Sequence, residues 1–175
     1  MKKGTKILSL GILFLFVCTL SLSAQKCKFS TQKDKVTGKI KKWNSIKFLP
    51  KGTINGSQIS FIKTDTTYHF EMFIISKGNF REPIQKGDPI VIKLSNEEEI
   101  TLTSIDEFKP TSQILDGLVT YRYKGLYEID AVLLKKIAEF QPTIISIFIG
   151  DKVYTDELSS KTGLKFSEGA ACILQ

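Results

Sequence analysis

Alternation of apolar side chains with a period of two constrains this chain most, because a β-strand places every second side chain on one face. The alternation is clearest in residues 86–103, where it runs on both sides of a polar stretch. The turn residues Gly87-Asp88-Pro89 come directly before it. The apolar positions are Ile90, Ile92, Leu94, Ile100 and Leu102. This segment predicts a β-hairpin, which needs further strands or helices to cover its apolar face.

The same period predicts strands through most of the chain. They are expected over residues 34–40, over 58–76 as a second hairpin, over 119–129 and over 143–149. The last run is almost entirely apolar and β-branched, so we expect a central strand buried on both faces. The parity slips between Trp43 and Ile46, which predicts a bulge near Asn44-Ser45.

Turn and loop signals separate these strands. Pro50-Lys51-Gly52, Asn55-Gly56 and Gly150-Asp151 are predicted turns. Residues 104–116 have mixed charge and are expected to form a loop.

The period changes to that of a helix after Ile129. Asp130 is a predicted N-cap, and the helix that follows should end before Pro142. Phe166, Ala170 and Ile173 predict a second, C-terminal helix, which Gly163 and Gly169 should weaken. The predicted fold class is therefore α+β: mainly antiparallel β-sheet, as a sandwich or partial barrel, with two helices in the C-terminal third.

The first residues predict export. A lysine-rich start, an apolar run over 7–20 and small residues up to Ala24 are typical of a cleaved signal peptide, expected to span residues 1–24. The apolar run is shorter than the roughly 20 residues that a membrane span needs. Residues 25–175 are then expected to form one domain, periplasmic or secreted, in contact with the membrane only through the cleaved signal.

The positive charge is concentrated in one segment. The chain has a net charge of +7, and its signal segment holds three lysines and no acid. Nine lysines and one acid, Asp34, lie between Lys26 and Lys51. This segment indicates either an anionic envelope partner, such as a lipid, a polysaccharide or an acidic protein, or a solvated basic flank. We expect no nucleic-acid partner.

Two cysteines remain after the predicted cleavage, near opposite ends of the chain. In an oxidising compartment Cys27 and Cys172 can form a disulfide, or each can be a small buried apolar residue. The sequence leaves both alternatives open.

The order of motifs resembles that of small uncharacterised exported proteins of Bacteroidota-type bacteria. The matching segments are Ala24-Gln25, Asp34–Lys39, Lys86–Pro89, Thr143–Asp151 and the closing stretch Lys165–Leu174. The resemblance implies location and architecture, and it carries no active site. It also implies one modification, because Asp65-Thr66-Thr67 is similar to an O-glycosylation acceptor pattern of such proteins, with Thr66 as the acceptor.

Few residues suit catalysis. His69 is the single histidine, and it is expected to face solvent beside Glu71. Metal-ligand spacing, a phosphate-binding loop and a paired-cysteine motif are absent from the sequence, so no metal or cofactor is expected. The acidic runs Glu97–Glu99 and Asp106-Glu107 lie in predicted loops.

Tyrosines of the long strand offer a second kind of site. Tyr121, Tyr123 and Tyr127 share one parity and predict an aromatic core face, with a stacking surface as the alternative. We therefore expect a non-catalytic exported envelope protein that binds an unknown ligand. The alternative is an envelope hydrolase that acts on polysaccharide through a carboxylate pair.

Overall fold

A computed structural model describes residues 27–48, 54–77, 82–115 and 117–175. The expected signal peptide, residues 1–24, and the expected turn at Pro50-Lys51-Gly52 lie outside the described residues.

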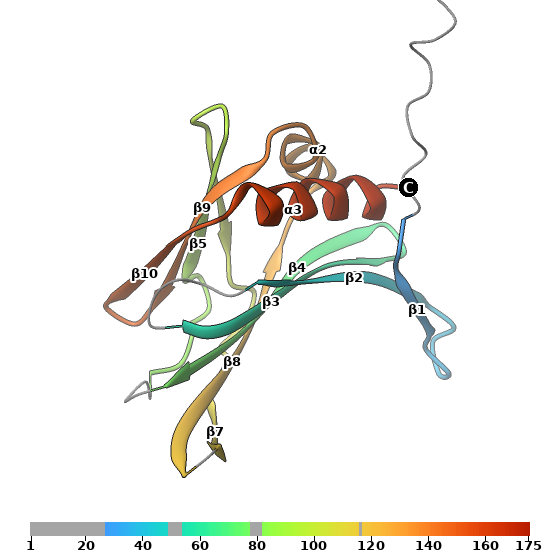
Figure 1. Cartoon of the computed structure of the whole chain (residues 1–175). Coiled ribbons are helices and arrows are strands. Elements are labelled where there is room, and N and C mark those ends of the chain that lie inside the picture. Colours follow the sequence, from blue (N-terminus) through green and yellow to red (C-terminus); the bar gives the residue numbers. More distant parts are fainter. Residues whose placement is uncertain (1–26, 49–53, 78–81, 116) are drawn as a thin grey trace, which may run out of the picture.

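Ten strands form two sheets in which every pairing is antiparallel, within the described residues. The larger sheet has six strands in the order β1-β2-β3-β4-β8-β7 and curls into a half barrel (Figure 1). Its strands are β1 (Ser30–Lys33), β2 (Ile40–Phe48), β3 (Ile54–Thr64), β4 (Thr67–Lys77), β8 (Leu118–Glu128) and β7 (Thr111–Leu115). The predicted second hairpin is confirmed as β3 and β4.

The smaller sheet has the order β10-β9-β5-β6. Its strands are β10 (Lys152–Glu157), β9 (Pro142–Ile149), β5 (Pro89–Leu94) and β6 (Glu99–Thr103). The hairpin expected over residues 86–103 is confirmed as β5 and β6, and its five alternating apolar side chains are all buried. The turn at Gly150-Asp151 is also confirmed, with Gly150 at a φ of 57°.

Two helices complete the fold, and both begin with the side-chain caps that their sequences favour. α2 (Ala131–Glu139) starts at Asp130, whose carboxylate accepts a hydrogen bond from the Leu133 N–H at 2.7 Å. α3 (Ser160–Ile173) starts at Ser159, whose hydroxyl accepts from the Thr162 N–H at 3.3 Å. In Figure 1, α3 lies across the six-stranded sheet with α2 beside it.

The core lies between the sheets and the helices. One hydrophobic cluster contains Phe61 and Phe70 of the larger sheet, Ile147 of the smaller sheet, Leu134 of α2 and Phe166 of α3. The α+β class, the dominance of antiparallel strands and the two late helices are confirmed.

The glycines of α3 allow a close approach to the sheets. A Cβ on Gly169 would lie 2.9 Å from Ile46 Cδ1 and 3.3 Å from a ring carbon of Phe61, while one on Gly163 would overlap the carbonyl oxygen of Pro142. These glycines lower the intrinsic helix propensity of α3, and in exchange its backbone lies directly against the strands.

Five local predictions are wrong. Residues 34–37 form a turn between β1 and β2, because the Asp34 carboxylate accepts hydrogen bonds from the N–H groups of Val36 (2.8 Å) and Thr37 (2.7 Å). Asn55-Gly56 lies within β3, beside a register shift, instead of in a turn. The loop expected over 104–116 contains β7. β9 is an inner strand of its sheet, yet only one of its faces is fully buried.

The bulge expected near Asn44-Ser45 is also wrong, because β2 pairs with β3 from Lys41 to Phe48 without a shift in register. Asn44 and Ile46 share the inward face, and Trp43 lies on the opposite face. The apolar alternation of this strand is interrupted because the polar residue Asn44 occupies an inward-facing position.

Candidate functional site

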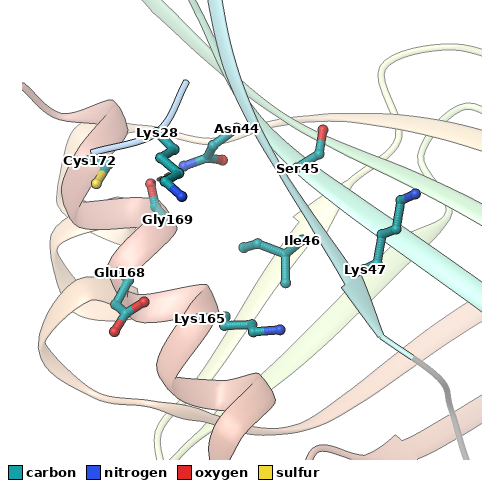
Figure 2. Close-up of a pocket in the computed structure, with 9 residues that line it drawn as sticks. All are labelled: Lys28, Asn44, Ser45, Ile46, Lys47, Lys165, Glu168, Gly169 and Cys172. Atoms are coloured by element: carbon teal, nitrogen blue, oxygen red, sulfur yellow. Dashed lines mark hydrogen bonds between the residues drawn. The ribbon is translucent and has the colours of Figure 1, made fainter. Parts of the chain in front are cut away.

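The described pockets concentrate where α3 lies beside β2. One pocket of about 540 Å³ lies along the contact between the helix and the second half of the strand (Figure 2). Figure 2 shows Asn44 and Ile46 on the side of β2 that faces α3, with Ser45 and Lys47 on its other side and Lys165 extending from the helix toward the strand. The lining residues are Lys28, Asn44, Ser45, Ile46, Lys47, Lys165, Glu168, Gly169 and Cys172.

A second pocket of about 810 Å³ adjoins the first and shares Lys47 and Lys165 with it. Residues at one end of strands β3 and β4 and in the first turns of α3 line it. Its lining residues are Lys47, Gly56, Ser57, Gln58, Phe73, Ile75, Ser159, Lys161, Thr162 and Lys165. We call the two adjoining pockets the lysine groove.

The groove is accessible because β1 pairs with only the first half of β2. The pairing of the two strands ends at Ser30 and Trp43, so β1 does not cover residues 44–48 of β2. The chain before β1 instead runs to α3, where Cys27 and Cys172 form a disulfide with their Cα atoms 5.3 Å apart. The covalent link holds the neighbouring Lys28 at the wall of the first pocket.

Positive charge dominates the lysine groove. Lys28, Lys47, Lys161 and Lys165 line it, and Glu168 is the one acidic residue among its lining residues. Lys93, Lys124 and Lys136 form ion pairs elsewhere on the molecule. A concave surface with this charge balance attracts anions.

Asn44 ties the strand wall of the groove to the helix wall. Its side-chain nitrogen donates to the Gly169 carbonyl at 2.6 Å, and its side-chain oxygen accepts from the Phe61 N–H at 3.2 Å. Both contacts are buried, which makes the spacing of the two walls rigid.

The predicted catalytic candidates do not come together. His69 is half-buried on the face of β4 opposite the core, where it pairs with Ile62 and Glu128 on the neighbouring strands. Glu71 forms an ion pair with Lys124 at 2.8 Å.

The acidic runs are similarly engaged in surface ion pairs. Glu97 contacts Lys93, Glu98 contacts Lys136, and Glu107 lies 3.7 Å from Lys109. The hydrogen bond from the Lys136 ammonium holds the pKa of Glu98 below its ordinary value. A general acid of a glycosidase needs the opposite shift.

The tyrosines form the aromatic core face that their parity predicts. Tyr123 and Tyr127 are fully buried, and Tyr121 is half-buried at the edge of the core. Burial raises the pKa of Tyr123 to about 12 and raises that of Tyr127 further. The ring of Tyr127 lies back over Gly125, where a Cβ would be 2.8 Å from a ring carbon, so this position of β8 has no room for a side chain.

Thr66 is exposed in the two-residue turn between β3 and β4. The preceding Asp65 has a φ of 52°, in the left-handed region that aspartate tolerates in turns. The hydroxyl of Thr66 is therefore accessible, and its glycosylation stays a prediction.

Other chemistry finds little support in the described residues. They contain no group of three or more His, Cys, Asp or Glu side chains placed to hold a metal ion. None of their helices combines the length and the apolar character that crossing a membrane requires.

No family model, curated protein or solved structure matches the chain.

The basic segment of the sequence contains two of the four lysines that line the groove. Lys28 and Lys47 belong to the basic segment that was expected to attract an anionic partner, whereas Lys161, Lys165 and the buried Ser57 were not singled out. Lys161 and Lys165 are four residues apart on a helix, and that spacing places them on one face. Their meeting with Lys28 and Lys47 depends on the tertiary fold.

Proposed function

We propose that this protein is a non-catalytic exported domain that binds an anionic envelope ligand in the lysine groove. The observation that carries the proposal is that four lysines from three separate parts of the chain line two adjoining pockets. Lysines of a solvated flank have no reason to gather in this way, since like charges repel.

The disulfide supports the exported part of the proposal. Disulfides persist in oxidising compartments and are rare in the cytosol, and Cys27–Cys172 also forms part of the groove architecture. Intact mass of the protein from its native host tests export directly, with residues 1–24 expected to be missing from the mature chain.

Binding of anionic probes to the disulfide-bonded protein tests the function. Octyl phosphate, glycerol phosphate and polygalacturonate serve as anions, with dextran as the neutral comparison, in calorimetric titrations at low and high salt. We expect one or more of the anions to bind and dextran not to bind. The affinity should fall as salt rises, because the attraction is largely electrostatic.

A matched pair of variants separates a site from general attraction to positive charge. One variant replaces Lys28, Lys47, Lys161 and Lys165 by Gln, and the other replaces Lys33, Lys35, Lys39 and Lys41, which are exposed residues of β1, β2 and the turn between them. Both lose four charges. We expect the first variant to lose binding by about tenfold or more and the second to bind nearly as the parent does. Equal losses in the two variants would contradict the proposal.

A further inference from the structure

We propose that the open edge of β2 in the lysine groove binds an extended acidic peptide, which adds to the larger sheet as a further strand beside β2. This inference rests on the proposed function and adds the class of partner. The backbone of β2, the position of the first pocket and the charges around that pocket support it.

The second half of β2 has one unpaired edge within the described residues. β1 pairs with β2 from Ile40 to Trp43, and β2 then continues to Phe48 beside β3 alone. Residues 44–48 extend over about 17 Å, at roughly 3.4 Å per residue. A strand edge of this kind can pair with another chain, because no described strand lies opposite its outward N–H and C=O groups.

The backbone groups that face this edge belong to Ser45 and Lys47. The Asp34 N–H donates to the Lys39 carbonyl oxygen at 2.8 Å, across the turn that joins β1 and β2. Since the backbone groups of an antiparallel strand face alternate sides, every second residue after Lys39 faces the β1 side. Trp43 meets β1 there, and Ser45 and Lys47 come after the end of the pairing. Their N–H and C=O groups form the row with which an added strand would pair.

The first pocket reaches this edge. Ser45 and Lys47 line it together with Asn44 and Ile46, although Figure 2 shows the side chains of the two pairs on opposite sides of β2. A pocket that touches residues of both faces extends to the edge between them. Since residues of α3 line the same pocket, an added strand would lie beside β2 and along the helix. Strand addition to an exposed sheet edge is a recurrent mode of peptide recognition.

The charges around the pocket favour an acidic peptide. Lys28, Lys47 and Lys165 line it with one acid, Glu168, and Lys165 extends from α3 toward the strand (Figure 2). Side chains of an added strand alternate between the two faces of the sheet, so every second one would face α3. Carboxylates at these alternate positions would complement the lysines on that side. A second copy of the chain would instead bring its own lysines to the edge, which like-charge repulsion opposes.

Short capped peptides test the inference by calorimetry on the disulfide-bonded protein at low salt. The acidic peptide is Glu-Thr-Glu-Thr-Glu-Thr, acetylated and amidated, and the neutral comparison has Gln in place of each Glu. We expect the acidic peptide to bind about tenfold or more tightly than the neutral one. It should also bind more tightly than glutarate, which carries carboxylates without a backbone that can pair with β2.

N-methylation of alternate residues separates strand addition from charge attraction, because it removes backbone donors from one edge of the peptide and leaves its charge unchanged. One peptide carries the methyl groups on its Thr residues and the other on its Glu residues. We expect one of them to lose binding by about tenfold or more and the other to bind nearly as the unmethylated peptide does, since an added strand pairs through one edge. For a strand antiparallel to β2, the methylated Thr residues should be the harmful set.

A proline in β2 tests the same edge from the side of the protein. Ser45→Pro removes a backbone N–H that faces the edge and keeps every lysine. It should weaken binding of the acidic peptide by about tenfold or more and leave that of glycerol phosphate unchanged. Val153→Pro is the matched control, because Val153 lies on the outer strand β10 and does not line the pocket. Its N–H also faces outward, since Ile149 and Lys152 close the two-residue turn at Gly150-Asp151.

The outcomes separate this inference from the proposed function. Binding of glycerol phosphate or polygalacturonate without tighter binding of the acidic peptide, or equal effects of the two methylated peptides, would overturn the added strand and leave an anion-binding groove. Failure of every anionic probe would overturn both. A dimer of the parent protein in sedimentation that Ser45→Pro dissociates would assign the edge to a second copy and overturn the peptide. Loss of peptide binding in Ser45→Pro but not in Val153→Pro would support the inference, and the methylated peptides decide it if Ser45→Pro does not fold.

Discussion

At the scale of single residues, Asn44 has the clearest structural role. It occupies an inward-facing position of β2, between strands of an apolar core, and bonds both to β3 and to α3. A buried amide at this place is stable only because each of its two ends has a partner. Asn44 therefore joins the curled sheet to the helix that forms the other wall of the groove.

Replacing Asn44 by Ala tests this role. The Phe61 N–H and the Gly169 carbonyl would each lose a partner, so we expect the free energy of unfolding to fall by about 1–3 kcal/mol. Urea unfolding followed by circular dichroism measures the change. Gln32→Ala, an exposed amide on β1, should change it by less than about 0.5 kcal/mol. Similar losses in both variants would contradict the role of Asn44.

The buried tyrosines predict sensitivity to alkali. The pKa of Tyr123 is raised from 10.0 to about 12 and that of Tyr127 is raised further, so folding favours their protonated forms. This stabilisation is fully present below pH 10 and is lost as the pH rises through the folded pKa values. In a tyrosinate absorbance titration, these two of the five tyrosines should ionise only as the protein unfolds. Ionisation of all five near pH 10 in folded protein would show that the two rings are solvated.

Thr66 supplies the one prediction about modification. Its hydroxyl lies in an exposed two-residue turn, where a glycan would not disturb the strands. Mass spectrometry of the peptide that contains Thr66, from protein made in the native host, should show an added glycan that Thr66→Ala removes. An unmodified peptide would leave an ordinary turn.

At the scale of elements, β9 is the strand on which the smaller sheet depends. It lies between β10 and β5 in the sheet order, and its side chains Ile145, Ile147 and Ile149 are buried in the common core. A charge on this face would have no partner and no water.

Ile147→Asp should therefore prevent folding or lower stability by several kcal/mol, which is comparable to the whole stability of a domain. Thermal unfolding by circular dichroism measures the effect. The control is Val153→Asp on the paired strand β10, where the side chain is 52% exposed, and it should shift the melting temperature only slightly. An unchanged melting temperature for Ile147→Asp would mean that β9 is not a core strand.

At the scale of the whole molecule, one covalent bond joins the beginning of the described chain to its last helix. Cys27 and Cys172 are separated by 145 residues in sequence, so the disulfide closes almost all of the described chain into a loop. It also places Lys28 beside α3, which couples the integrity of the groove to the redox state of the protein.

Two measurements test the disulfide. Denatured, unreduced protein without residues 1–24 should titrate with no free thiol, and two free thiols per chain would exclude the bond. The double variant Cys27→Ala/Cys172→Ala should be less stable by up to about 5 kcal/mol on the chain-entropy estimate for a loop of this length. It should also bind anionic probes more weakly, since Lys28 would no longer be held at the groove.

The sequence alone determined most elements, because the signals of a strand, a turn and a helix cap are local. The alternation in β5 and β6, the shared face of Tyr123 and Tyr127, and the cap at Asp130 depend only on neighbouring residues. The alternation of apolar residues predicted the wrong structure where contact with a neighbouring element, and not the local sequence, determines which residue a position accepts. Asn44 faces inward because α3 offers it a carbonyl, and Gly163 and Gly169 are tolerated because α3 approaches the strands closely.

Only the tertiary structure decided the groove. Lys28 and Lys47 come from the basic segment and Lys161 and Lys165 from the last helix, and no periodicity relates residues so far apart. They meet because α3 lies across the larger sheet beside the part of β2 that β1 does not pair with. Such long-range contacts are set by the burial of whole faces, and the buried faces become visible only when both partners are in place.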